Sequence, residues 1–75
     1  GFRVYPNPAT DVLSVEVISS GEVEIVLYSI SGMRVYSAFV RGTHHKIDIS
    51  ELPEGVYFVR FRSKTRSAIK KIIKR

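Results

Sequence analysis

The feature that most constrains the fold is a regular alternation of side chains near the carboxyl end. Residues 56–63 read Val-Tyr-Phe-Val-Arg-Phe-Arg-Ser. Successive side chains of a strand point to opposite faces of its sheet, so Tyr57, Val59 and Phe61 are expected on one buried face. The other, mostly basic face would carry Phe58, Arg60 and Arg62. Gly55 precedes this strand, and we expect it to supply a positive φ or a close backbone approach in the turn.

Further strands are predicted at intervals of about 8–12 residues, with turn signals between them. Segments 11–18 and 22–29 repeat the alternation. Val26 and Tyr28 make the second face of 22–29 partly apolar as well, which predicts a strand that is either central or covered by a loop. Ser31-Gly32 predicts a hairpin. The remaining predicted strands cover residues 1–5, 33–40, 44–49 and the last segment of the chain.

This spacing predicts an all-β protein, a small antiparallel sandwich or barrel of about seven strands. A chain of 75 residues makes one domain at most, here residues 1–75. The absence of cysteine excludes disulfides and thiolate metal sites. No apolar run approaches the roughly 20 residues that a membrane-spanning helix needs, so we expect no membrane insertion.

The last segment, Ala68–Arg75, allows two interpretations. Ile69, Ile72 and Ile73 have helical spacing, and lysine is a good helix former. As a strand, the segment would place Ile69, Lys71 and Ile73 on one face, and one lysine would have to be accommodated at a sheet edge. Isoleucine is β-branched and the rest of the chain is all-β, so we favour the strand.

The basic residues are concentrated in the same region. Eight of the twelve lie from Arg60 to Arg75, and no acidic residue follows Glu54. A net charge of +5 is typical of proteins that bind nucleic acid or anionic membranes. The face around Phe58 resembles a single-strand nucleic-acid surface but lacks a second aromatic reader, so no nucleic-acid partner is expected. A basic end of the chain fits equally well an exposed tail that another protein reads.

No pattern in the chain predicts catalysis or a bound metal. His44 and His45 are adjacent, so on a strand they point to opposite faces and cannot share one ion. Asn7 and Asp11 are two candidate oxygen ligands, short of the roughly 6–8 that calcium takes, and loop-closing hydrogen bonds are favoured instead. Ser, His and Asp occur without a nucleophile elbow. We therefore expect no enzymatic activity, no cofactor and no metal.

Several segments, taken in order, resemble the carboxy-terminal sorting domain of the type IX secretion system of Gram-negative bacteria. The resemblance spans nearly the whole chain and keeps the order and spacing of the family. The residues that carry it are Val4-Tyr5-Pro6-Asn7-Pro8-Ala9 with Asp11, Leu13 and Val15, then Ile25-Val26-Leu27-Tyr28 with Gly32, Ile47-Asp48-Ile49-Ser50 with Leu52, Gly55-Val56-Tyr57-Phe58-Val59, and Lys70-Lys71-Ile72-Ile73-Lys74. Arg75 departs mildly from sequences that end at the lysine.

The resemblance implies a small immunoglobulin-like β-sandwich at the end of a larger secreted protein, without a catalytic role. Such a domain addresses its cargo from the periplasm to an outer-membrane translocon. A sortase-like peptidase then typically removes the domain and can attach the cargo to anionic lipopolysaccharide, which leaves the cargo at the cell surface or outside the cell.

By matching position, the resemblance also implies roles for particular residues. Recognition by the translocon would use Lys70, Lys71, Ile72, Ile73 and Lys74. The structural signature would be Tyr5, Pro6, Asn7, Pro8, Gly32, Gly55 and Tyr57. The alternative is an immunoglobulin-like accessory or stalk module that binds carbohydrate, protein or nucleic acid. In either case the isolated domain could associate with itself through exposed edge strands.

Overall fold

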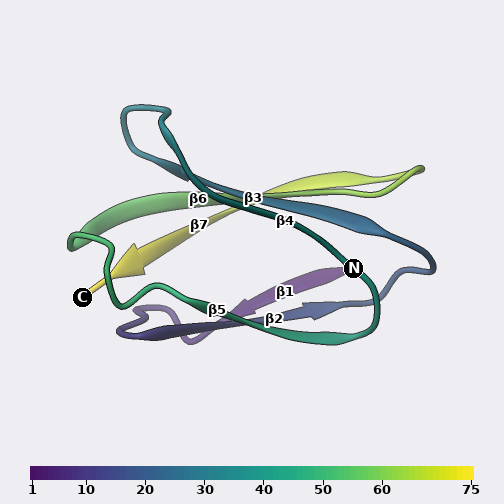
Figure 1. Ribbon diagram of the computed structural model, residues 1–75, viewed down its shortest axis with the longest axis horizontal. Helices are drawn as coiled ribbons and strands as arrows, with labels where there is room; N and C mark the ends of the chain where they lie inside the picture. The colour runs from purple at the N-terminus through teal and green to yellow at the C-terminus, as the bar shows by residue number, and fades with distance from the viewer.

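The computed structural model describes residues 1–75 as seven strands in two layers (Figure 1). The strands are β1 (Phe2–Tyr5), β2 (Val12–Val17), β3 (Val23–Ser29), β4 (Arg34–Val40), β5 (His44–Asp48), β6 (Gly55–Arg62) and β7 (Ser67–Lys74). The structure contains no helix that could span a membrane.

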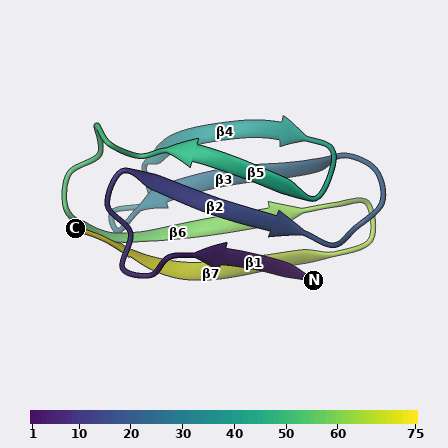
Figure 2. The ribbon, with the colours of Figure 1, turned by 90° about the horizontal axis from the view of Figure 1, so that it is seen from below.

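All strand pairs are antiparallel, and the two sheets have the orders β1-β2-β5 and β4-β3-β6-β7. The chain changes layer after β2, after β4 and after β5 (Figure 2). This is an immunoglobulin-like arrangement in which the fourth strand pairs with the third. The predicted all-β sandwich of seven strands is confirmed, and residues 67–74 form a strand rather than a helix.

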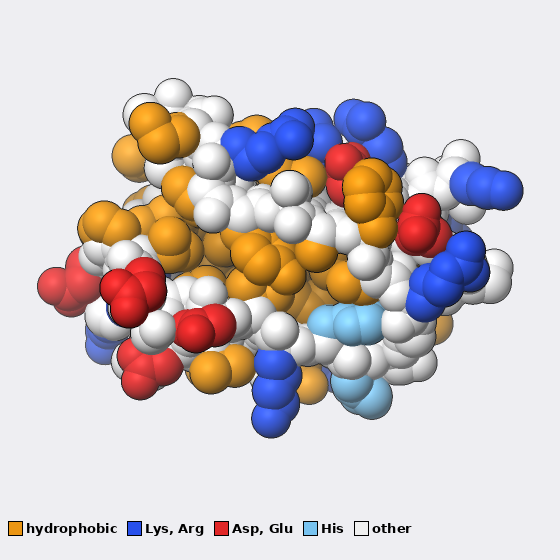
Figure 3. Space-filling model, viewed as in Figure 1, with side chains coloured by type: hydrophobic (Ala, Val, Ile, Leu, Met, Phe, Trp, Pro, Cys, Tyr) orange, Lys and Arg blue, Asp and Glu red, His pale blue; other side chains and the backbone are white.

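The hydrophobic core lies between the two sheets. Phe2 from β1 and Phe61 from β6 stack across it, with ring centroids 4.8 Å apart and the rings inclined by 8°. Seen from the side of β4 and β5, apolar side chains are visible between the layers (Figure 3). The rest of the core cluster consists of Ala9, Leu13, Val15, Val17, Val23, Ile25, Leu27, Ile47, Ile49, Tyr57, Val59 and Ile72.

The two faces of the larger sheet follow the predicted alternation. The inward side chains of β6 are those expected: Tyr57, Val59 and Phe61. Of the two alternatives predicted for residues 22–29, the central strand is confirmed, because β3 lies between β4 and β6. Val26 is fully buried although it points outward. It pairs with Arg60, whose guanidinium lies 3.3 Å from Glu24 and 5.5 Å from the ring centre of Tyr28.

Two glycines make turns that other residues rarely allow. Gly32 has a φ of +89°, and its N–H donates to the carbonyl of Ser29 at 2.9 Å in the β3–β4 hairpin. This confirms the predicted hairpin. Gly55 has a φ of +151° at the start of β6. A Cβ there would meet nothing within 4 Å, so the backbone conformation explains this glycine and a close approach does not.

A buried tyrosine fastens the turn that leads into β6. The hydroxyl of Tyr57 donates to the carbonyl of Pro53 at 2.6 Å, and Tyr57 is only 5% exposed. Immunoglobulin-like sandwiches carry the same feature, a tyrosine corner, at the corresponding strand. The alternation predicted that Tyr57 is buried, but its hydrogen bond was not foreseen.

A short turn at the end of β5 is held by a carboxylate. Asp48 Oδ1 accepts hydrogen bonds from the hydroxyl of Ser50 at 2.6 Å and from its backbone N–H at 2.9 Å. These two bonds hold the pKa of Asp48 below its usual value of 3.8. Asp48 therefore stays ionised at neutral pH and keeps its acceptor role in this turn.

Candidate recognition surface

The last strand, β7, lies at the edge of the four-stranded sheet. It pairs along its whole length with β6, from Ser67 opposite Arg62 to Lys74 opposite Gly55. In an antiparallel ladder, alternate residues turn their N–H and C=O groups toward the partner strand, and the residues between them turn these groups away. The backbone groups of Ile73 and Lys71 form hydrogen bonds to the loop between β1 and β2. These two residues therefore belong to the set that points away from β6.

The carboxyl half of this outer edge is covered by the loop between β1 and β2. The carbonyl of Ile73 accepts from the N–H of Ala9 at 2.8 Å, and the N–H of Arg75 donates to the carbonyl of Ala9 at 2.8 Å. The side chain of Asn7 continues this pairing. Its Oδ1 accepts from the N–H of Ile73 at 3.0 Å, and its Nδ2 donates to the carbonyl of Lys71 at 3.3 Å. Asn7 thus takes the place of a neighbouring strand.

The amino half of the edge has no such cover. Because Ile73 and Lys71 point their backbone groups outward, Ile69 and Ser67 do so as well. No other strand pairs with β7 along residues 67–70, which we call the open half of β7. The open half of β7 therefore presents unpaired backbone donors and acceptors at this edge of the larger sheet.

The five residues predicted for translocon recognition divide into two groups. Lys70 and Lys71 are exposed, and Ile73 is 40% exposed. Ile72 is 1% exposed and belongs to the core. Lys74 is 8% exposed, with its ammonium donating to the carbonyl of Arg75 at 3.1 Å. The structure thus brings all five onto one edge strand but leaves only part of the set accessible.

One face of β7 carries the residues expected from the sequence, but this face points away from the core. Ile69, Lys71 and Ile73 do share a face, but it is the outer one, and Ile69 is 66% exposed. The inner face carries Ile72 and the mostly buried Lys74. The apolar residues of β7 therefore do not all face the core, because the register with β6 places Ile72 opposite the buried Tyr57.

The predicted signature residues are spread over three places. Tyr5, Pro6, Asn7 and Pro8 lie in or beside the loop that covers β7, whereas Gly32, Gly55 and Tyr57 belong to turns elsewhere. Both amide atoms of Asn7 take part in hydrogen bonds to the backbone of β7. Sequence reasoning missed the contact of Asn7 with β7. The only sequence signal that points to this contact is the position of Asn7 between two prolines.

Replacing Asn7 by alanine should loosen the end of β7. The change removes both hydrogen bonds to Lys71 and Ile73, so we expect the free energy of unfolding to fall by about 1 kcal/mol. Amide exchange of Ile73, measured by NMR, should become faster. Asn7→Asp is the matched control, because it keeps an acceptor for the Ile73 N–H. Equal exchange of Ile73 in wild type and Asn7→Ala would show that the side chain does not hold the strand.

The fold and this edge define a class of protein: a small immunoglobulin-like β-sandwich whose last, basic strand is half covered by an early loop. The family described as "Secretion system C-terminal sorting domain" matches residues 3–75. The chain belongs to this family of type IX sorting domains, and the resemblance found in the sequence is confirmed. It is a sorting-signal domain, and its family implies secretion to the cell surface or the extracellular space.

A curated relative supports the same assignment. The chain is 35% identical over 72 residues to β-agarase D of Zobellia galactanivorans. The matched region covers 96% of this chain but only 14% of the agarase, so the chain spans a small part of that protein's length. The similarity is therefore confined to a segment of the agarase about as long as this domain.

Proposed function

We propose that an outer-membrane translocon of the type IX system recognises this domain through β7. The observation that carries the proposal is that Lys70 and Lys71 are exposed on a strand whose outer edge is half open. A signal that another protein reads must be accessible while the domain stays folded, and this segment meets both conditions. Lys70, Lys71 and Ile73 contact the translocon, whereas Ile72 and Lys74 anchor the strand to the sandwich.

The same proposal covers the route of the cargo. The domain, attached behind its cargo, passes through the periplasm and directs export across the outer membrane. A sortase-like peptidase then removes it, and the cargo is anchored at the cell surface. Family membership supports this route. The hydrophobic core of the domain consists of its own residues. Peptidase cleavage in front of the domain would therefore not divide a core shared with the cargo, which supports the removal step.

The alternative function, an accessory module that binds carbohydrate, protein or nucleic acid, has less support. Arg60 would have to contact a nucleic-acid ligand on the outer face of the larger sheet. It is instead paired with Glu24 and stacked on Tyr28. The charge of Arg60 is therefore already partly satisfied within the domain.

Secretion of a fluorescent reporter fused in front of residues 1–75 tests the proposal, in a bacterium that has the translocon. Truncation after Ile69 would remove the buried Ile72 and risk unfolding, so a double variant, Lys70→Gln with Lys71→Gln, is preferable. We expect the secreted fraction to fall several-fold. The matched control, Arg34→Gln with Lys46→Gln, neutralises two exposed cations on other strands and should leave secretion unchanged.

Two results would count against the proposal. Retention of the unaltered fusion in the periplasm, with the domain folded, would overturn the sorting function in this bacterium. Equal secretion of the unaltered fusion and the β7 double variant would overturn the role of the two lysines but not the sorting function.

A further inference from the structure

A basic groove runs along the open side of the sandwich, between the edge strands β1 and β7. It consists of two adjoining hollows of about 480 and 300 Å³. Phe2 and Lys70 line both of them. The other lining residues are Gly1, Thr65, Arg66, Ser67 and Ala68 in the larger hollow, and Arg3, Val4, Asn7, Lys71 and Ile72 in the smaller. None of them is acidic.

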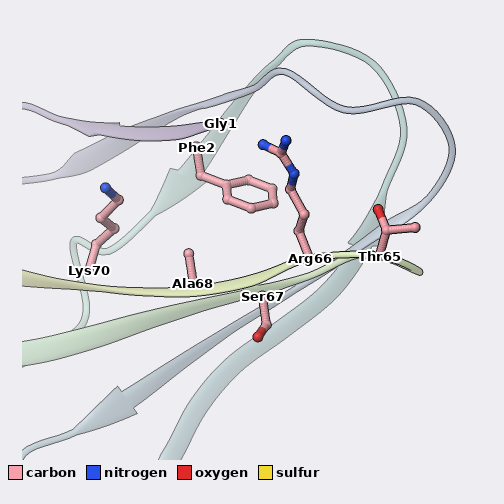
Figure 4. A pocket seen from close by; sticks show the side chains of 7 residues that line it. All are labelled: Gly1, Phe2, Thr65, Arg66, Ser67, Ala68 and Lys70. Atoms are coloured by element: carbon pink, nitrogen blue, oxygen red, sulfur yellow. The ribbon is translucent and has the colours of Figure 1, made fainter.

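The apolar part of the groove is flanked by two cations. The ring of Phe2 projects from β1 toward β7, and the side chains of Arg66 and Lys70 rise on either side of it (Figure 4). Arg66 and Lys70 are both exposed and make no ion pair within the chain. The groove thus has an apolar centre between positive charges that have no internal partner.

The backbone at this groove is also unpaired. The open half of β7 turns the N–H and C=O of Ile69 outward, as shown above. On β1, Gly1 pairs with Ile18 through backbone hydrogen bonds of 2.8 and 3.1 Å. The ladder with β2 therefore leaves the backbone groups of the next residue, Phe2, pointing away from β2. Both sides of the groove offer alternating donors and acceptors.

We propose that this groove binds an extended, acidic segment of a partner protein, which adds as a strand to the open half of β7. The inference deepens the proposed function and rests on it in one respect, that β7 is a recognition surface. Residues 67–70 span roughly 13 Å of strand, enough for a short augmenting segment. Carboxylates on the inner face of that segment would lie near Lys70 and Arg66, whose side chains rise on the side of β7 that faces Phe2 (Figure 4).

The nature of the groove favours a peptide over other anions. A nucleic acid, an anionic polysaccharide or a membrane surface could neutralise Arg66 and Lys70. None of these carries the alternating N–H and C=O groups that would pair with Ile69. Asn7 and Ala9 already bind the carboxyl half of the same edge with one side chain and one backbone segment, so this edge accepts peptide groups within the domain itself.

Binding of a defined probe to the purified domain tests the proposal. The probe is a short fluorescein-labelled peptide that alternates glutamate with valine, and binding is followed by fluorescence anisotropy at low and physiological salt. A peptide with lysine in place of glutamate controls for charge. Polyglutamate controls for charge without strand formation. We expect binding of the alternating acidic peptide alone, weakened by salt.

Two variants separate strand addition from simple charge attraction. The N–H of Ile69 points away from β6, so Ile69→Pro removes a donor from the open edge without removing a bond to β6. Ile69→Ala is the matched control, since it truncates the side chain and keeps the N–H. We expect Ile69→Pro to weaken binding about tenfold or more and Ile69→Ala to leave it nearly unchanged. Lys70→Glu should weaken binding of the acidic peptide and favour the lysine peptide.

Amide exchange of Ile69 in the unaltered domain, with and without peptide, gives a readout that needs no variant. Slower exchange on binding supports strand addition even if Ile69→Pro fails to fold. Absence of binding, equal binding of the lysine peptide or polyglutamate, or unchanged exchange of Ile69 would each overturn the proposal. So would a dimer that excludes the peptide, because it would assign the edge to a second copy. None of these results depends on secretion, so the proposed function is tested separately.

Discussion

Replacing Phe61 by alanine is expected to lower the free energy of unfolding by about 3–5 kcal/mol. Phe61 is fully buried in β6 and stacks on Phe2 of the other sheet. The change leaves a cavity between the sheets and removes the aromatic pair. A domain of this size has a total stability on the order of 4–11 kcal/mol, so the variant should be near the limit of folding. Urea denaturation monitored by circular dichroism measures the loss.

Phe39→Ala is the matched control for this prediction. Phe39 lies on the outer face of the same sheet and is 67% exposed. Its truncation removes little buried area, so we expect a change within about 0.5 kcal/mol. Similar losses for Phe61→Ala and Phe39→Ala would mean that the core does not lie between the sheets as described.

Replacing Tyr57 by phenylalanine is expected to cost about 1–3 kcal/mol, although it removes a single oxygen atom. The hydroxyl of Tyr57 donates to the carbonyl of Pro53, and the tyrosine is almost completely buried. Without it, the carbonyl loses its partner in the turn before β6. Thermal unfolding of the variant measures the cost.

Tyr5→Phe provides the comparison for Tyr57→Phe. Tyr5 is 41% exposed, and its hydroxyl makes no hydrogen bond within the chain, so its loss should have little effect on stability. Equal, small effects of the two changes would argue against a tyrosine corner. Tyr57 does not line the groove between β1 and β7, so Tyr57→Phe should also leave peptide binding by the folded domain unchanged.

Much of the fold could be predicted because strand alternation is a local property. The side chains of Tyr57, Val59 and Phe61 must share a face in any strand, whatever lies next to it. Turn residues such as Gly32 separate these strands, and their positive φ is a requirement of the local backbone. These signals predicted about seven strands in a sandwich or barrel, the family resemblance implied the sandwich, and the structure is a sandwich of seven strands.

The candidate site was predicted less completely. The family resemblance implied a recognition role for residues 70–74, and the structure places all five on β7. The sequence did not indicate that Lys74 is mostly buried or that Ile69 is mostly exposed. Both faces of this strand carry isoleucine and lysine, so the sequence allows either face to point toward the core. Pairing with β6 decides which face does so.

The sequence alone therefore determined the strand content, the inward faces of the central strands and the position of the basic residues along the chain. Only the tertiary structure decided which half of the β7 edge is open. That choice depends on Asn7, whose hydrogen bonds reach Lys71 and Ile73 across 64 and 66 residues of chain. No local pattern encodes such a contact, because it exists only once the two sheets have packed and brought the first loop beside the last strand.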